Sequence, residues 1–151
     1  MRKRISTMIS LLFILLLSYT YAGAIDLTQD KYVKVYEDMT KAVYLNKESP
    51  VVTRYSPPYY IIQGECIIDD FSSNRIYTHI SNYFYNYDQQ EIATNNTFTT
   101  IYYKDGSSET FPVPPDYPLN PVIPLPKDSV GSIIGHMYFY LCYDIPFYKD
   151  L

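Results

Sequence analysis

Hydrophobic and polar residues alternate along most of the chain, and this two-residue period is typical of β-strands with one covered face. A run rich in aromatic and β-branched residues, 59–68, follows Pro57 and Pro58. These prolines exclude a helix because they lack a backbone N–H. We therefore expect 59–68 to be the central strand of a sheet. Its apolar face consists of Tyr60, Ile62, Gly64, Cys66 and Ile68.

The same alternation predicts further strands on both sides of the central one. They cover Tyr32–Glu37, 42–46, 76–88, 91–104 and 109–113, with a short pairing stretch at 51–55. Asp, Ser and Asn residues at 69–74 indicate a turn, as does the pair Asp105 and Gly106. The polar stretch 94–97 indicates a bulge. Short turns of this kind join neighbouring strands into an antiparallel meander.

One stretch near the C-terminus has the period of a helix instead. Apolar residues recur there at helical spacing: Val130, Ile133, Ile134, Met137, Tyr138 and Leu141. Asp128 and Ser129 are candidate caps, so a helix is expected over Val130–Tyr143, with Pro146 ending it. The prolines of 112–126 predict an extended crossover rather than another strand, and a docking motif for a proline-reading module is the alternative.

These elements together predict an α+β fold. We expect an antiparallel β-sheet meander of five or six strands with one C-terminal helix packed on one face. A chain of 151 residues is long enough for one such domain.

The N-terminal segment indicates a compartment. Three basic residues at 2–4 precede an apolar run at 9–17 and small residues at 22–24, as in a secretory signal peptide. An uncleaved membrane anchor is the alternative, although the apolar run is shorter than the ~20 residues that a spanning helix needs. We expect residues 1–24 to be a signal peptide and 25–151 to be the exported domain, in the periplasm or at the cell surface, with no membrane span after cleavage.

Charge narrows the class of partner. Removal of the three basic residues at 2–4 changes the formal net charge from −4 to −7. This acidic balance argues against nucleic acid, which rewards basic patches, and against purely electrostatic binding to anionic lipid. An unknown protein or envelope component is the expected partner.

The two cysteines, Cys66 and Cys142, lie on the central strand and near the end of the predicted helix. In an exported protein an even number of cysteines favours oxidation, so we predict a disulfide between them. Two separate buried thiols, too far apart for a bridge, are the alternative.

The 19 tyrosines suit a sheet with half-wet surfaces, because the ring packs while the hydroxyl reaches a polar partner. Tyr83, Tyr85 and Tyr87 share one face of the strand at 76–88. Their rings are the candidate contact surface for a partner. The alternative is that they are half-buried residues of the sheet.

No catalytic, cofactor or metal motif is evident. His79 and His136 are the only histidines, and neither stands in a known triad or zinc spacing. We therefore predict no catalytic, cofactor-binding or metal-ligating residues. A small periplasmic hydrolase or isomerase, using a histidine and a carboxylate brought together by folding, is the alternative.

Several phrases resemble the surface-adhesin protein E-like family of small exported bacterial proteins: KAVYLNKES, YKDGS and PLPKDSVGSIIGHMYFYLC. Ser49, Pro126, Ser129 and Cys142 fall at positions of that pattern, whereas Asn46 replaces its usual Asp. The first strand has no tryptophan, and Tyr32 stands in its place. The resemblance implies an antiparallel sheet with a packed C-terminal helix and exposure at the cell surface.

These observations lead to one functional hypothesis: an exported, non-enzymatic bacterial envelope or cell-surface protein that acts as a binding, adhesin-like or accessory module.

Overall fold

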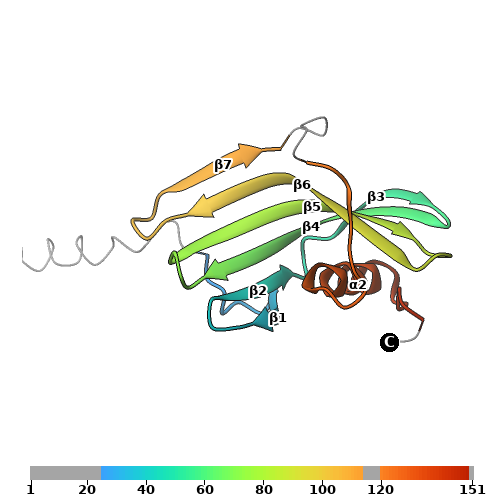
Figure 1. The fold of residues 1–151 in the computed structure, drawn as a ribbon, viewed down its shortest axis with the longest axis horizontal. Coiled ribbons are helices and arrows are strands. Elements are labelled where there is room, and N and C mark those ends of the chain that lie inside the picture. Colours follow the sequence, from blue (N-terminus) through green and yellow to red (C-terminus); the bar gives the residue numbers. More distant parts are fainter. Residues whose placement is uncertain (1–24, 114–119, 150–151) are drawn as a thin grey trace, which may run out of the picture.

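The computed structural model describes residues 25–113 and 120–149. The predicted signal peptide, 1–24, and the centre of the proline-rich stretch, 114–119, lie outside the described residues. Within the described ranges, eight strands form one antiparallel sheet, followed by helix α2 (Figure 1). The elements are β1 (Tyr32–Glu37), β2 (Lys41–Asn46), β3 (Val51–Ser56), β4 (Tyr59–Asp70), β5 (Arg75–Asn86), β6 (Glu91–Tyr102), β7 (Ser108–Pro112), β8 (Ile123–Pro124) and α2 (Val130–Tyr143).

The fold class is confirmed, whereas the predicted number of strands is too small. The sheet runs in the order β1-β2-β4-β5-β6-β7, with β3 paired to β4 and β8 paired to β6. The prediction that the proline-rich stretch contains no strand is wrong at β8, where Ile123 pairs with Thr94. Leu125 follows by donating its backbone N–H to the carbonyl of Ile92 (2.8 Å), so a short pairing survives despite the missing N–H of Pro124.

Strand β4 is central, as its sequence predicts. It pairs with β5 along its whole length and with β2 and β3 along its other edge. Ile62, Gly64 and Cys66 of the predicted apolar face are buried, and Ile67 of the opposite face is buried as well. The predicted turn at 69–74 is too long, because Asp69 and Asp70 extend the strand by pairing with the start of β5.

Local turn chemistry explains the remaining connections. The backbone N–H of Asp38 donates to the carbonyl of Lys41 (2.9 Å), closing the β1–β2 hairpin. Gly106 has a positive φ of 84° in the turn before β7, a conformation open to glycine. The predicted bulge in β6 is present, because the register with β5 shifts across Thr97.

Helix α2 has the predicted bounds. The Ser129 side chain accepts a hydrogen bond from the backbone N–H of Ser132 (3.2 Å), which caps the first turn. Asp144, in the left-handed region at φ 56°, ends the helix two residues before Pro146. The chain is therefore already out of the helix when it reaches the expected breaker.

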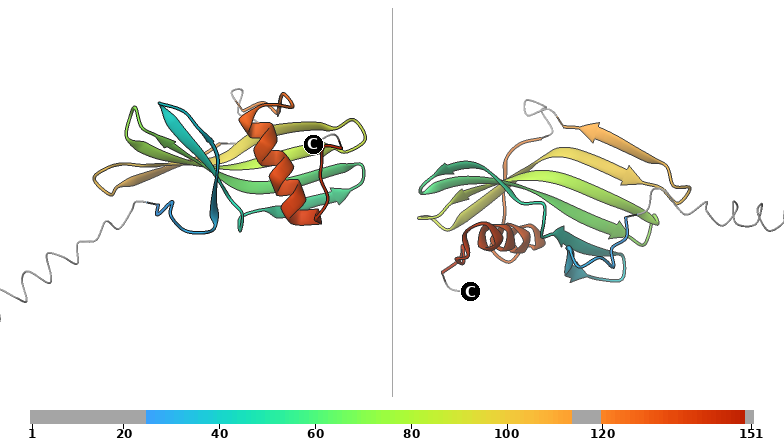
Figure 2. Two further views of the ribbon diagram at one scale, coloured as in Figure 1. Left: turned by 90° about the horizontal axis from the view of Figure 1, so that it is seen from below. Right: turned by 180° about the vertical axis from the view of Figure 1, so that it is seen from behind.

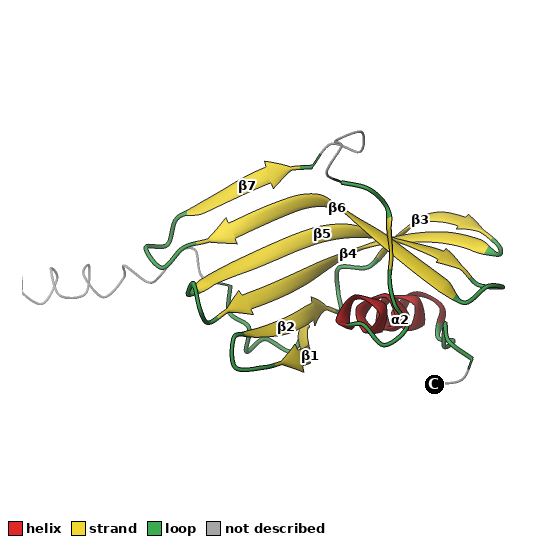
Figure 3. Cartoon of the chain, in the orientation of Figure 1, coloured by secondary structure: helices red, strands yellow, loops and turns green. Residues whose placement is uncertain are grey.

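The helix crosses one face of the sheet, and the core lies between the two layers (Figures 2 and 3). Aromatic rings dominate this layer, and the following residues are the largest of those fully buried: Tyr138, Tyr148, Phe139 and Phe147. Tyr138 lies edge-on to Tyr83 with 5.4 Å between ring centroids, over the gap that Gly64 leaves in β4. Ring contacts therefore join the helix to the sheet, together with buried aliphatic side chains such as Ile62, Ile92 and Ile134.

Candidate functional site

A cavity of about 580 Å³ opens where α2 begins. We call it the N-cap groove, after Ser129, which caps the helix at its rim. The β1–β2 turn, the sheet and the first turns of α2 form its walls. Its polar lining groups include Asp38, Lys41, Cys66, His79, Ser81, Asn96 and Asp128, and its apolar ones include Val43, Ile68, Tyr83, Val130 and Ile134.

The register of the sheet determines which side chains form the floor of the groove. Cys66 on β4 lies directly opposite His79 on β5, and Ser81 lies opposite Asn96 on β6. Residues directly opposite in an antiparallel pair point to the same face. The floor therefore presents a thiol, an imidazole, a hydroxyl and an amide side by side.

The imidazole of His79 is held from one side. Its Nδ1 lies 3.0 Å from the hydroxyl oxygen of Thr99, which faces it from β6. Burial lowers the pKa of His79 below its usual value because the charged ring loses contact with water. The ring is therefore neutral at pH 7.

The thiol of Cys66 is buried and free. Burial raises its pKa to about 12, and the negative charge of Glu65 adds to the effect. Cys66 is therefore a protonated thiol at neutral pH, although a histidine stands opposite.

The predicted disulfide is wrong, since Cys142 is also free. Cys66 lies under the first turns of α2, where it lines the groove with Ile134. Cys142 comes eight residues after Ile134, about 12 Å further along the helix axis at 1.5 Å per residue. Cys142 does not line the groove, so the two thiols lie in different parts of the layer between helix and sheet.

The carboxylate of Asp38 is engaged in its own turn. It accepts hydrogen bonds from the hydroxyl (2.7 Å) and backbone N–H (2.7 Å) of Thr40 and from the backbone N–H of Lys41 (3.0 Å), and the Tyr36 hydroxyl also donates to it (2.9 Å). These bonds, led by the one from the Thr40 hydroxyl, lower the pKa of Asp38. Asp38 borders the groove mainly as a fixed negative charge.

The predicted tyrosine contact surface is wrong for its first two members. Tyr83 is 4% exposed and Tyr85 is 2% exposed, because α2 covers the face that carries them. The Tyr85 hydroxyl donates to the backbone carbonyl of Gly135 in α2 (2.8 Å). Tyr87 is half-buried and stacks on Phe139 with 5.7 Å between centroids. These rings belong to the core between helix and sheet.

His136 lies apart from the groove and has a packing role. Its ring is parallel to that of Tyr148, with 5.6 Å between centroids, and its Nδ1 accepts a hydrogen bond from the backbone N–H of Tyr148 (3.3 Å). Partial burial lowers its pKa. His136 therefore helps to hold the segment after α2.

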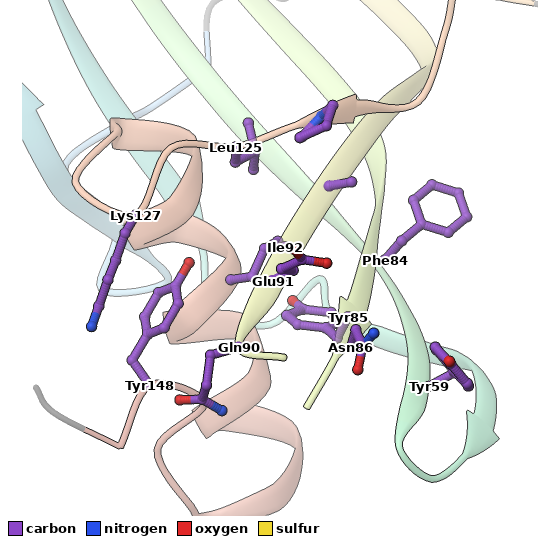
Figure 4. A pocket seen from close by; sticks show the side chains of 12 residues that line it. Tyr59, Phe84, Tyr85, Asn86, Gln90, Glu91, Ile92, Leu125, Lys127 and Tyr148 are labelled. Carbon is purple, nitrogen blue, oxygen red and sulfur yellow. The ribbon is translucent and has the colours of Figure 1, made fainter. Parts of the chain in front are cut away.

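A second cavity, of about 500 Å³, borders the start of β6 (Figure 4). Several of its polar side chains already have partners within the protein. Gln90 donates to the carbonyl of Tyr87 (2.8 Å) and accepts from the backbone N–H of Lys149 (2.8 Å). The Lys127 ammonium lies 5.2 Å from the ring centre of Tyr148. We therefore regard the N-cap groove as the better candidate site.

Sequence reasoning missed the pairing of Cys66 with His79. The position of the turn after β4 could have revealed this pairing. Asp70 pairs with Arg75 across the turn, and this pair fixes the register of all the other pairs between β4 and β5. The predicted lack of metal-ligating residues stays a prediction. Among the described residues, no group of three or more His, Cys, Asp or Glu side chains is arranged to hold a metal ion.

Comparison of the chain with family models, with curated proteins and with solved structures gives no significant match. Across the part of the chain that the structure describes, no helix combines the length and hydropathy needed to cross a bilayer.

Proposed function

We propose that the protein is an exported, non-enzymatic envelope or cell-surface protein of bacteria that binds a partner in the N-cap groove. The partner is an envelope component or a protein segment with both apolar and polar groups. The observation that best supports this function is the groove itself. It is a cavity of about 580 Å³, lined by polar and apolar side chains, at the N-terminal end of α2.

The protonation states of the floor favour binding over chemistry. The thiol of Cys66 keeps its proton at neutral pH, so it is not an activated nucleophile. The ring of His79 contacts a threonine hydroxyl rather than a carboxylate that would orient it as a base. Such groups offer hydrogen bonds to a ligand without reacting with it.

A small hydrolase or isomerase remains the second candidate, because folding places His79 in one cavity with two carboxylates, those of Asp38 and Asp128. A simple ester such as nitrophenyl acetate tests it. Hydrolysis that is lost in His79→Gln and kept in His136→Gln would favour the enzyme over the binding module.

Groove binding is tested with the neutral fluorescent dye Nile red, titrated into the purified protein. We expect saturable binding of one dye, lost in Ile68→Lys, which adds a charge to the groove wall. Val52→Lys is the matched control, since Val52 is 40% exposed on β3, outside the groove. Binding that is weak and unsaturable, or equally reduced in both variants, would contradict the groove as a binding site.

A further inference from the structure

We propose that Cys66 and His79 form a two-ligand site for copper(I) on the floor of the N-cap groove. The inference deepens the proposed function, because it rests on the groove being a binding site and assigns one class of ligand to it.

Geometry brings the two ligands together. Cys66 and His79 are direct cross-strand partners in the middle of the β4–β5 pairing, and both line the groove. The Cβ atoms of such partners lie roughly 4.5 to 5.5 Å apart. Sulfur and nitrogen ligands sit roughly 2.0 to 2.3 Å from a transition metal, so a single ion fits between two side chains at this spacing.

Thr99 orients the imidazole ring of His79. When Nδ1–H donates to the Thr99 hydroxyl, 3.0 Å away, the Nε2 lone pair is left for a metal. Metal-bound histidines almost always donate their other N–H in this way.

Charge selects a monovalent ion. The Cys66 thiol is protonated in the metal-free protein, so copper(I) has to displace this proton: binding breaks the Sγ–H bond, forms an Sγ–Cu bond and releases the proton to solvent, while copper stays in the +1 state. One positive charge replaces another, so the buried site gains no net charge, whereas a divalent ion would add one positive charge to it.

The ligand set points to the same ion. Thiolate and imidazole are soft to intermediate ligands that suit copper, whereas calcium and magnesium require oxygen ligands. Among the described residues no group of three or more His, Cys, Asp or Glu side chains is arranged to hold a metal ion, as a tetrahedral zinc site would need. Copper(I) is the ion that best fits one sulfur and one nitrogen.

The test is an anaerobic titration of the purified protein with copper(I) in competition with the chelator bicinchoninate. We expect one ion per chain, with binding lost in Cys66→Ser, which removes the sulfur ligand, and lost or strongly weakened in His79→Asn, which removes the nitrogen ligand. The chain supplies matched controls, Cys142→Ser and His136→Asn, which should bind as the unaltered protein does.

The copper site would be refuted if Cys142→Ser lowered the copper affinity as much as Cys66→Ser does. It would also be refuted if neither Cys66→Ser nor His79→Asn changed the affinity. Nile red separates this failure from failure of the groove. A Cys66→Ser protein that binds dye but not copper supports the metal site, and one that binds both refutes it while leaving the groove intact. If Cys66→Ser no longer binds Nile red, the substitution has disrupted the groove itself. The copper affinity of His79→Asn, in a variant that still binds the dye, then tests the metal site.

Discussion

At the scale of single residues, the missing side chain of Gly64 leaves the space in which the large ring of Tyr138 packs. A Cβ atom at this position would lie 2.5 Å from Cε2 and 2.6 Å from Cζ of Tyr138. That ring is fully buried, and its hydroxyl donates to the backbone carbonyl of Glu65, so it has little freedom to move. The contact between helix and central strand therefore depends on a glycine.

We expect Gly64→Ala to lower the free energy of unfolding by about 1 to 3 kcal/mol, because the added methyl group overpacks the core. Urea denaturation followed by circular dichroism measures the change. Gly131→Ala is the control: its Cβ would lie 3.1 Å from the flexible Cδ2 of Leu125, and alanine favours the helix by up to about 1 kcal/mol. An equal loss in both variants would contradict the role of Gly64.

His79 makes stability depend on pH. Its folded-state pKa is lowered by burial from the ordinary value of 6.5. Below about pH 6.5 the unfolded chain therefore binds a proton that the folded chain resists, and stability falls as pH decreases, by at most about 1.4 kcal/mol per pH unit, until the folded-state pKa is reached.

We expect His79→Gln to reduce the loss of stability between about pH 7.5 and 5.5, measured by urea denaturation at each pH. Comparison with the unaltered protein cancels the carboxylates that titrate in both. His136 has a pKa lowered in the same direction but is less deeply buried, so His136→Gln should reduce the loss by less. A pH profile unchanged by His79→Gln would refute the burial effect.

At the scale of elements, α2 combines a defined start with a sequence that contains no charged residue. Its N-terminus depends on Ser129, whose side chain accepts from the N–H of Ser132. Ser132 is itself fully buried, and its hydroxyl contacts the hydroxyl of Tyr148 at 2.6 Å. Ser132 therefore links the capped first turn of the helix to the segment that follows its end.

Ser129→Ala should cost about 0.5 to 2 kcal/mol of stability, because one helix N–H loses its acceptor. Thermal and urea denaturation measure the loss. Ser129→Asn, which restores a capping oxygen, should recover most of it. No difference between the alanine and asparagine variants would mean that the cap contributes little.

At the scale of the whole molecule, the proposed function requires export of the chain by its predicted signal peptide, residues 1–24. Expressed in a bacterial host, the full chain should appear in the periplasm or at the surface, with Ile25 as its first residue. Deletion of residues 2–24 should leave it in the cytoplasm, since the targeting signal is removed. Fractionation and intact mass spectrometry test this. A membrane-bound product that keeps residues 1–24 would indicate the anchor instead.

Elements whose signals are local in sequence were predictable. The bounds of β1 and α2 follow from alternation, helical spacing and the Ser129 cap, and the bulge near Thr97 follows from a polar stretch within a strand. The burial of Tyr83 and Tyr85 was not predictable from local pattern, because both faces of a tyrosine-rich strand suit packing against a helix.

Periodicity and turn residues alone predict that β4 is central, that the strands run antiparallel and that a helix follows them, because these signals act over a few positions. The position at which α2 crosses the sheet follows from long-range packing instead. That crossing buries the tyrosines, keeps Cys142 away from Cys66 and leaves the groove open at the start of the helix. The physical reason is that helix placement depends on ring packing over Gly64, between residues more than 70 positions apart in the chain.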